Sequence, residues 1–276
     1  MNGFKEICIK LRKQDYTLPE IVKITGRPKT SVHFHIRNIP LSRKKLIEIR
    51  EASDKRMLLF SSNRKGRSER SFIKFDRWDR SMVCLVSHLI FDGEIKQSGC
   101  IYNNRSDTLL AKVEAAMKKI YSFEPTRYIN NVTGVKRISY FNVVLSVFIR
   151  EKAHELIKEI GVYPVWAKVE FLRSFFDDEG CMDFRPKENR RQIRGYQKDV
   201  SILFVVQKLL SDLEITSRIL KPNEIVISGK ENLIRFRKTI DFSPGIYMNG
   251  NRTNSRWKKS LEKRILLDEA IKSFRN

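Results

Sequence analysis

Two stretches of the sequence place an acidic residue directly before a glycine, at the end of an apolar run. Residues 85–93 end in Asp92 and its glycine, and residues 172–180 end in Glu179 and its glycine. The apolar runs favour helices, so each carboxylate would lie at a helix C-terminus. That end of a helix already carries partial negative charge, and an acid there costs stability unless a cation or a metal ion offsets it. The pattern therefore favours a functional role for both acids over a capping role.

Paired carboxylates that hold divalent metal ions can hydrolyse phosphodiester bonds. The metal activates a water molecule at neutral pH and stabilises the charge on the leaving oxygen. Carboxylate oxygens are hard ligands, which favour Mg²⁺ or Mn²⁺ over Zn²⁺. Asp92 and Glu179 could do this chemistry if the fold brings their carboxylates together. Asp177 and Asp178 point away from Glu179 on a helix, so we predict that their role is secondary.

The two stretches read as copies of one motif. Their acids lie 87 residues apart (179 minus 92), and a serine, Ser87 or Ser174, stands five positions before each acid, where close contact of two helices needs a small residue. These residues resemble the signature of the LAGLIDADG family of homing endonucleases, which reads here as residues 172–180 and, in a degenerate form, as residues 85–93. For a single chain with two repeats, the resemblance implies that the two signature helices pack on a pseudo-twofold axis. It also implies that their final acids, Asp92 and Glu179, meet at the active centre as the catalytic acids and the metal ligands.

The same resemblance implies a lysine near the scissile phosphate in each half. Lys230 matches the position after the last strand of the second half. The corresponding residues of the first half, 145–148, include no lysine, and Lys136 in the preceding predicted strand is the remaining candidate. His88 and Phe91 also stand where the motif has small or aliphatic residues. These departures favour either one weak half-site or a protein that binds without cleaving.

The order of predicted elements repeats around the two stretches. Each copy reads as a helix, two strands, a helix, two strands and a helix, and such internal duplication is stronger evidence than one motif. We predict an α+β fold: a pseudo-twofold duplicated αββαββα domain, with saddle-shaped antiparallel sheets by the resemblance, preceded by an all-α helix-turn-helix domain. The predicted divisions are residues 1–58 (helix-turn-helix domain with a connecting helix), 59–76 (basic linker), 77–162 (repeat 1) and 163–276 (repeat 2 with a C-terminal helix).

Three short helices are predicted near the start of the chain, in residues 4–38. Thr17 and Glu20 form a capping-box pattern at the second helix, and Gly26 provides a tight turn before the third. The module resembles a helix-turn-helix, in which the start of the third helix meets base edges in the major groove. That helix supplies the predicted DNA contacts Lys29, Thr30, Ser31, His33 and Arg37.

Basic residues are concentrated in two further segments. The chain carries 55 Lys and Arg against 32 Asp and Glu, and its net charge of +23 requires a polyanionic partner. Residues 185–198 form a polar hairpin which, by the resemblance, lies in the major groove, where Arg pairs with guanine and Gln with adenine. Its cations would repel each other unless phosphates neutralise them. The predicted contacts of the linker and the hairpin are Arg64, Arg67, Arg190, Arg191, Gln192, Arg194, Tyr196 and Lys198.

Double-stranded DNA is the predicted partner, and structured RNA is an alternative. No apolar run approaches the ~18 residues needed to cross a bilayer, so we exclude a membrane partner. The first 16 residues hold no signal-peptide core, which predicts a cytoplasmic protein, and two repeats in one chain predict a monomer. The 4 cysteines form no Cys-x-x-Cys pair and indicate neither a zinc site nor disulfides.

Two classes of function stay open. The first is a site-specific, metal-dependent DNA endonuclease of the homing type, which the acids in both signatures favour. The second is a non-cleaving transcriptional regulator resembling WhiA-type proteins, which combine a LAGLIDADG-like scaffold with a helix-turn-helix; the missing lysine and the N-terminal module favour it. An RNA maturase shares the same scaffold. We take the endonuclease as the leading hypothesis.

Overall fold

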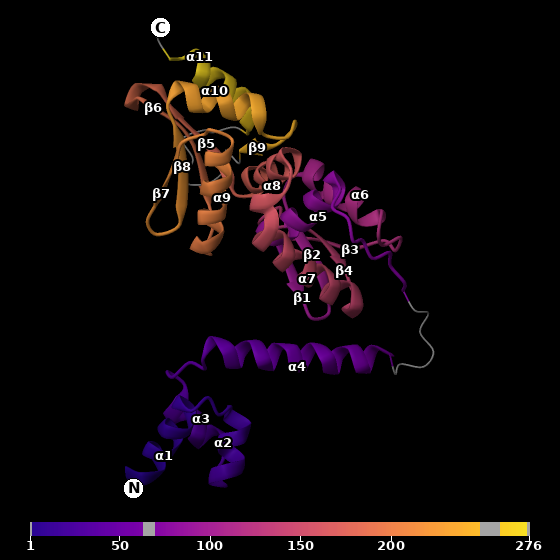
Figure 1. Ribbon diagram of the computed structural model, residues 1–276, viewed down its shortest axis with the longest axis vertical. Coiled ribbons are helices and arrows are strands. Elements are labelled where there is room, and N and C mark those ends of the chain that lie inside the picture. The colour runs from indigo at the N-terminus through magenta and orange to yellow at the C-terminus, as the bar shows by residue number, and fades with distance from the viewer. Residues whose placement is uncertain (1, 63–69, 249–259, 275–276) are drawn as a thin grey trace. The chain divides into compact units, whose positions relative to one another are not determined.

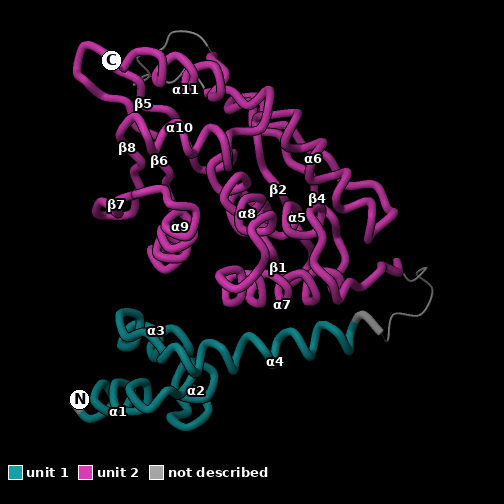
Figure 2. The backbone as a smooth tube through the Cα atoms, turned by 45° about the horizontal axis from the view of Figure 1, so that its top comes forward, with its two compact units in different colours: residues 1–65 teal, residues 66–276 magenta. Residues whose placement is uncertain are grey.

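The computed structural model describes residues 2–62, 70–248 and 260–274 of the chain (Figure 1). The predicted DNA contacts Arg64 and Arg67 lie outside these residues. The chain divides into two compact units, residues 1–65 and 66–276 (Figure 2). Each unit has its own hydrophobic core.

Unit 1 is helical throughout its regular elements. The first three helices bury one apolar face each, and the shared core consists of Cys8, Ile21, Val32 and Ile36, each at most 2% exposed. The helices of the unit are α1 (Asn2–Lys13), α2 (Leu18–Thr25), α3 (Lys29–Ile36) and α4 (Arg43–Ser62).

Local sequence signals set the ends of these helices. The Glu20 carboxylate accepts a hydrogen bond from the backbone N–H of Thr17 at 2.6 Å, and Gly26 ends α2 with a left-handed φ of 63°, as the capping pattern and the glycine predict. The connecting helix α4 extends to Ser62, past the predicted division at residue 58, because Leu58 and Leu59 are good helix formers.

Unit 2 contains one order of elements twice, which confirms the duplicated αββαββα arrangement and the α+β class. The first copy consists of α5 (Arg80–Phe91), β1 (Gly93–Lys96), β2 (Gly99–Asn104), α6 (Asp107–Lys118), β3 (Thr126–Ile129), β4 (Lys136–Tyr140) and α7 (Val143–Glu159). The second copy consists of α8 (Val165–Asp178), β5 (Gly180–Arg185), β6 (Arg190–Tyr196), α9 (Val200–Asp212), β7 (Ser217–Leu220), β8 (Glu224–Ser228) and α10 (Lys230–Thr239).

Each copy contributes one four-stranded antiparallel sheet. The strand orders, β1-β2-β4-β3 and β5-β6-β8-β7, are the same when the copies are aligned. In the first sheet Tyr102 lies opposite Ile138 and Asn104 lies opposite Lys136, so these side chains share one face. Tyr102 and Ile138 are 0% and 2% exposed, which identifies this face as the one that packs against the helices.

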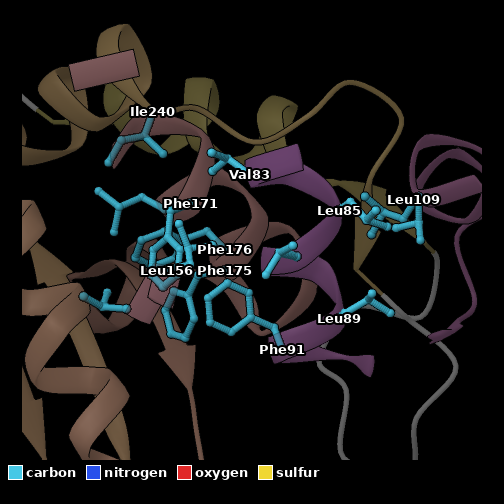
Figure 3. Close-up of a cluster of buried hydrophobic side chains, with 14 of the residues drawn as sticks. Val83, Leu85, Leu89, Phe91, Leu109, Leu156, Phe171, Phe175, Phe176 and Ile240 are labelled. Atoms are coloured by element: carbon cyan, nitrogen blue, oxygen red, sulfur yellow. The ribbon is translucent and has the colours of Figure 1, made fainter. Parts of the chain in front are cut away.

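The two signature helices, α5 and α8, pack against each other at the centre of the unit. Ser87 and Ser174, expected at the contact, are both 0% exposed. The Phe91 ring makes edge-to-face contacts with the rings of Phe171 and Phe175, with both centroid distances 5.2 Å (Figure 3). Such aromatic pairs add about 0.5–1.5 kcal/mol each beyond their buried area, so this contact holds the C-terminal ends of the two helices together.

The C-terminal segment closes the second copy. Two short strands, β9 (Tyr247–Met248) and β10 (Leu261–Glu262), pair with each other and lead into α11 (Lys263–Lys272). This is the predicted C-terminal helix, and it packs against β5 and α10 through Leu266, Leu267 and Ala270, which are at most 1% exposed.

Candidate functional site

The two predicted catalytic acids occupy equivalent positions. Asp92 follows α5 directly, Glu179 follows α8 directly, and a glycine that starts the next strand comes after each acid. A Cβ on Gly180 would lie 2.4 Å from the carbonyl oxygen of Phe176, one turn earlier in the helix. A Cβ on Gly93 would meet the equivalent backbone at 2.5 Å. Only glycine permits this tight passage from helix to strand, and the passage fixes where each carboxylate lies.

The acids are electrostatically coupled. Burial, and then the charge of Asp178, raises the pKa of Asp92 to about 7. Burial, and then the charge of Asp92, raises the pKa of Glu179 to about 8. Two partly buried carboxylates that disfavour each other's ionised form make a site that a cation stabilises. The structure therefore brings Asp92 and Glu179 into one electrostatic environment.

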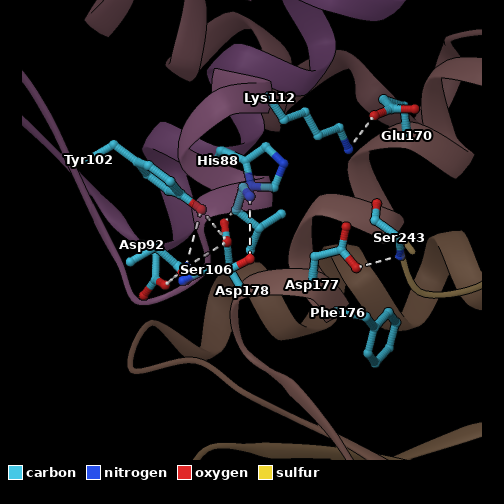
Figure 4. Close-up of polar contacts among 12 residues, drawn as sticks. His88, Asp92, Tyr102, Ser106, Lys112, Glu170, Phe176, Asp177, Asp178 and Ser243 are labelled. Carbon is cyan, nitrogen blue, oxygen red and sulfur yellow. Dashed lines mark hydrogen bonds and ion pairs between the residues drawn. The ribbon is translucent and has the colours of Figure 1, made fainter. Parts of the chain in front are cut away.

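A hydrogen-bond network crosses from one signature helix to the other at Asp92 (Figure 4). The Asp178 carboxylate accepts a hydrogen bond from the Tyr102 hydroxyl at 2.6 Å and lies 2.7 Å from Nδ1 of His88. The Asn104 side-chain NH₂ group donates to Asp92 at 2.7 Å and to the Tyr102 hydroxyl oxygen at 3.2 Å. The network therefore ties Asp92 in the first copy to Asp178 in the second.

Asp178 has a larger role than its expected secondary one. The side chains of both Asp178 and His88 are 0% exposed. Burial raises the pKa of Asp178 and lowers the pKa of His88 to about 3, so burial disfavours the charged form of each group. Asp177 is also buried, but its carboxylate accepts from the backbone N–H of Ser243 at 2.8 Å, in a different part of the core.

A buried lysine supplies the cation that the helix C-terminus needs. Nζ of Lys263, at the start of α11, donates to the carbonyl oxygens of Phe176 and Asp177 at 3.1 and 2.7 Å. Burial lowers the pKa of this lysine, while its charge in turn lowers the pKa of both Asp92 and Glu179. Sequence reasoning missed Lys263, because only tertiary packing brings it to the end of α8.

The two lysines predicted from the sequence lie at the start of a strand and at the start of a helix. Lys136, at the start of β4, forms an ion pair with Asp107 at 2.5 Å. Lys230 is the first residue of α10, directly after Gly229. The lysine whose charge acts on the pKa of both acids is Lys263, and it belongs to neither predicted position.

The donor set fits a hard divalent cation bound together with a substrate. No group of three or more His, Cys, Asp or Glu side chains in the described ranges forms a metal cluster. Mg²⁺, however, is commonly held by one or two carboxylates, with phosphate oxygens and water completing its shell. The carboxylates of Asp92 and Glu179 could supply the protein's part of such a shell.

The hairpin of β5 and β6 presents its polar residues on two faces. Gln192, Arg194 and Tyr196 share one face by strand alternation, and Tyr196 is 52% exposed. Arg191 lies on the opposite face, where its Nε donates to Ser273 at 2.7 Å and its guanidinium stacks on Phe274. Arg191 therefore contacts the C-terminal residues and does not share the face of Gln192, Arg194 and Tyr196.

Acidic side chains of the protein neutralise several arginines of this hairpin. The prediction that these cations need phosphates to neutralise them is therefore wrong for those arginines. Arg194 donates two hydrogen bonds to Glu224, at 2.5 and 2.6 Å, and a third to Asp183 at 3.1 Å. Arg185 lies 2.7 Å from Asp183, and Arg190 lies within 3.9 Å of the same carboxylate. DNA contact through these arginines would require exchange of these partners.

The third helix of unit 1 exposes the residues predicted to meet DNA. Lys29, Thr30, Ser31, His33 and Arg37 are all exposed, while Val32 and Ile36 between them are buried. The helix therefore presents a polar and basic surface opposite its core face.

A family model matches the second copy of the repeat. Residues 166–241 match the family model of a LAGLIDADG-like domain, a span from α8 through the end of α10. The chain is 36% identical over 93 residues to a probable translation initiation factor IF-2 of Pyrococcus horikoshii, a match that spans 34% of this chain and 8% of that protein.

Solved structures of LAGLIDADG proteins resemble the chain at low identity. The homing endonuclease I-DmoI in complex with DNA and Mn has a TM-score of 0.44 at 14% identity, covering 59% of this chain and 97% of that one. Full-length DUF199/WhiA from Thermatoga maritima has a TM-score of 0.46 at 15% identity, covering 74% of this chain and 63% of that one. I-DmoI has also been crystallised with Ca. Within the described residues, no helix is long and apolar enough to cross a membrane.

Proposed function

We propose that the protein binds a specific DNA site and hydrolyses its phosphodiester bonds with divalent metal ions held by Asp92 and Glu179. The observation that carries the proposal is the pair of coupled, partly buried carboxylates at equivalent ends of two packed helices, in a chain of net charge +23. A bound Mg²⁺ or Mn²⁺ would activate a water and stabilise the leaving oxygen.

Neighbouring side chains orient the two acids and stabilise the helix ends that carry them. Asn104 orients Asp92 through its hydrogen bond, and Lys263 offsets the negative end of α8. The aromatic contact between Phe91 and Phe175 holds the two helix ends together and limits the entry of water behind the acids. Gln192 and Tyr196 on the hairpin, with Lys29 on α3 and Arg37 directly after it, extend the proposed contact with DNA.

A cleavage assay tests the proposal. The full-length protein is incubated with a genomic DNA pool and Mg²⁺, and discrete fragments are expected; Ca²⁺ and EDTA serve as control conditions. Asp92→Asn and Glu179→Gln should each abolish double-strand cleavage into fragments and leave DNA affinity nearly unchanged, since each removes a metal ligand and little DNA contact. Glu151→Gln, an exposed acid on α7, is the matched control and should cut normally. Unchanged cleavage by Glu179→Gln would remove that residue from the mechanism.

A non-cleaving DNA-binding regulator is the second candidate. The ion pair of Lys136 with Asp107 favours it, because this pair occupies the candidate catalytic lysine of the first copy. Tight, salt-sensitive and sequence-specific DNA binding without fragments in either Mg²⁺ or Mn²⁺ would select the regulator. Preference for a structured RNA over duplex DNA in the same titration would select an RNA-binding role instead.

A further inference from the structure

The contact between the two signature helices is chemically unequal on its two sides. Aligning the final acids makes His88 the equivalent of Phe175, and Phe91 the equivalent of Asp178. Each side of the pseudo-twofold contact therefore pairs equivalent positions. On one side His88 lies 2.7 Å from Asp178, and on the other the rings of Phe91 and Phe175 lie 5.2 Å apart. A polar pair on one side replaces an aromatic pair on the other.

The strands beside these pairs also differ, with a polar side chain on one side and a glycine on the other. Tyr102 on β2 and Gly195 on β6 lie at equivalent register positions, each opposite the glycine that follows the acid. A Cβ on Gly195 would lie 2.5 Å from the Phe175 ring, so the ring fills the space beside this glycine. In the first copy Tyr102 occupies the equivalent position, and its hydroxyl reaches Asp178 at 2.6 Å. The polar side thus has a hydroxyl, a carboxyl group and an imidazole in contact, where the described residues of the aromatic side have two phenyl rings beside a glycine.

The polar set ends at Asp92. Asn104 donates a hydrogen bond to the Asp92 carboxylate. In the described residues, burial and nearby charges shift the pKa of Glu179, and no hydrogen bond contributes to that shift. We propose that Tyr102 and Asp178 are positioning residues for Asp92 alone, so that the two half-sites hold their acids unequally. The proposal rests on the proposed function, because it takes Asp92 as the acid of one half-site.

The mechanism of positioning follows from the hydrogen bonds of Asn104. Its Oδ1 accepts from the backbone N–H of Ser106 at 2.9 Å, which fixes the orientation of the amide. Its Nδ2 donates to Asp92 at 2.7 Å and to the Tyr102 hydroxyl at 3.2 Å. The hydroxyl donates its own hydrogen to Asp178, which turns an oxygen lone pair toward Asn104. Asn104 Nδ2 also reaches Asp178 directly, but only at 3.5 Å. Without the Tyr102 hydroxyl, the NH₂ group loses the nearer of these two acceptors, and the Asn104 side chain is held less firmly against Asp92.

The test removes one hydroxyl from the full-length protein. Tyr102→Phe takes away the hydroxyl that bonds both Asn104 and Asp178, and leaves only their direct contact at 3.5 Å. Tyr140→Phe is the matched control, because Tyr140 is a buried tyrosine on the neighbouring strand β4 whose hydroxyl has no hydrogen-bond partner in the described structure. Cooperative thermal melting of both variants shows that they fold.

The first measurement follows the cleavage of each DNA strand separately with end-labelled duplex. Loss of a group that orients a metal ligand costs about 10–100-fold, so Tyr102→Phe should slow by about tenfold or more the strand that Asp92→Asn slows most, with the other strand and the Tyr140→Phe control changed less than about twofold. Equal slowing of both strands by Tyr102→Phe, the result of general destabilisation, would overturn the proposal.

The second measurement does not need cleavage. The side-chain amide signal of Asn104 in an ¹H–¹⁵N NMR spectrum is assigned through its absence in Asn104→Asp, and its exchange with water is compared among the variants. Exchange should be slow in the wild type and in Tyr140→Phe, and clearly faster in Tyr102→Phe. If the wild type cuts neither strand but this change occurs, the proposed function fails and the positioning role stands. Unchanged exchange in Tyr102→Phe overturns the positioning role, whether or not the protein cuts DNA.

Discussion

Replacing Glu179 with glutamine should stabilise the metal-free protein at alkaline pH. Folding raises the pKa of Glu179 from the usual 4.5 to about 8. A group with a raised folded-state pKa contributes stability that is fully present below its unfolded pKa and is lost as the pH rises through its folded pKa. The wild type should therefore lose stability between pH 4.5 and about 8, and glutamine, which cannot ionise, should remove this group's share of the loss.

The size of the effect follows from the same rise in pKa. At 1.36 kcal/mol per pKa unit, the full rise corresponds to an upper bound of about 5 kcal/mol. Because Glu179 is only half-buried, solvent screening reduces the expected gain of Glu179→Gln to about 2 kcal/mol at pH 8, with no gain near pH 4. Urea denaturation in EDTA at both pH values measures the free energy of unfolding, with Glu151→Gln as the surface control. An equal effect of Glu179→Gln at the two pH values would refute the reasoning.

Other parts of the structure give further predictions. Lys263→Met should lower the free energy of unfolding by about 2–3 kcal/mol, because two buried carbonyl oxygens of α8 lose their charged donor. Lys272 is an exposed lysine of the same helix, and Lys272→Met should change this free energy little in the same urea titration. Lys29→Ala and Arg37→Ala should each flatten the plot of log DNA affinity against log salt by about 0.9. Lys13→Ala on α1 is the control and should leave the salt dependence of DNA affinity unchanged. If Lys29→Ala and Arg37→Ala also leave it unchanged, α3 does not contact DNA.

The order of elements in unit 2 could be predicted from the sequence because its signals are local. An apolar run that ends at an acid and a glycine marks where a helix gives way to a strand, and this signal occurs at both Asp92 and Glu179. The serines at the helix contact followed from the same alignment. Ser87 and Ser174 are indeed fully buried.

The side-chain partners of the site could not be predicted in the same way. Helix geometry predicts from the sequence only that Asp178 and Glu179 point in different directions. The contact of Asp178 with His88 depends on how α5 and α8 are rotated against each other, and the sequence of either helix alone does not determine that rotation. Lys263 is far from α8 in the sequence, and no local pattern connects them. The face of Arg191 depends on strand register, in which a shift of one residue reverses every side chain.

The binding of metal by Asp92 and Glu179 is the central claim, and anomalous diffraction tests it most directly. Crystals of the full-length protein with a bound DNA duplex, grown with Mn²⁺, would be measured at the manganese absorption edge. The proposed function predicts anomalous density within coordination distance of both carboxylates, and loss of density at the substituted residue in Asp92→Asn and in Glu179→Gln. Manganese bound elsewhere on the protein, with no density at either acid, would contradict it.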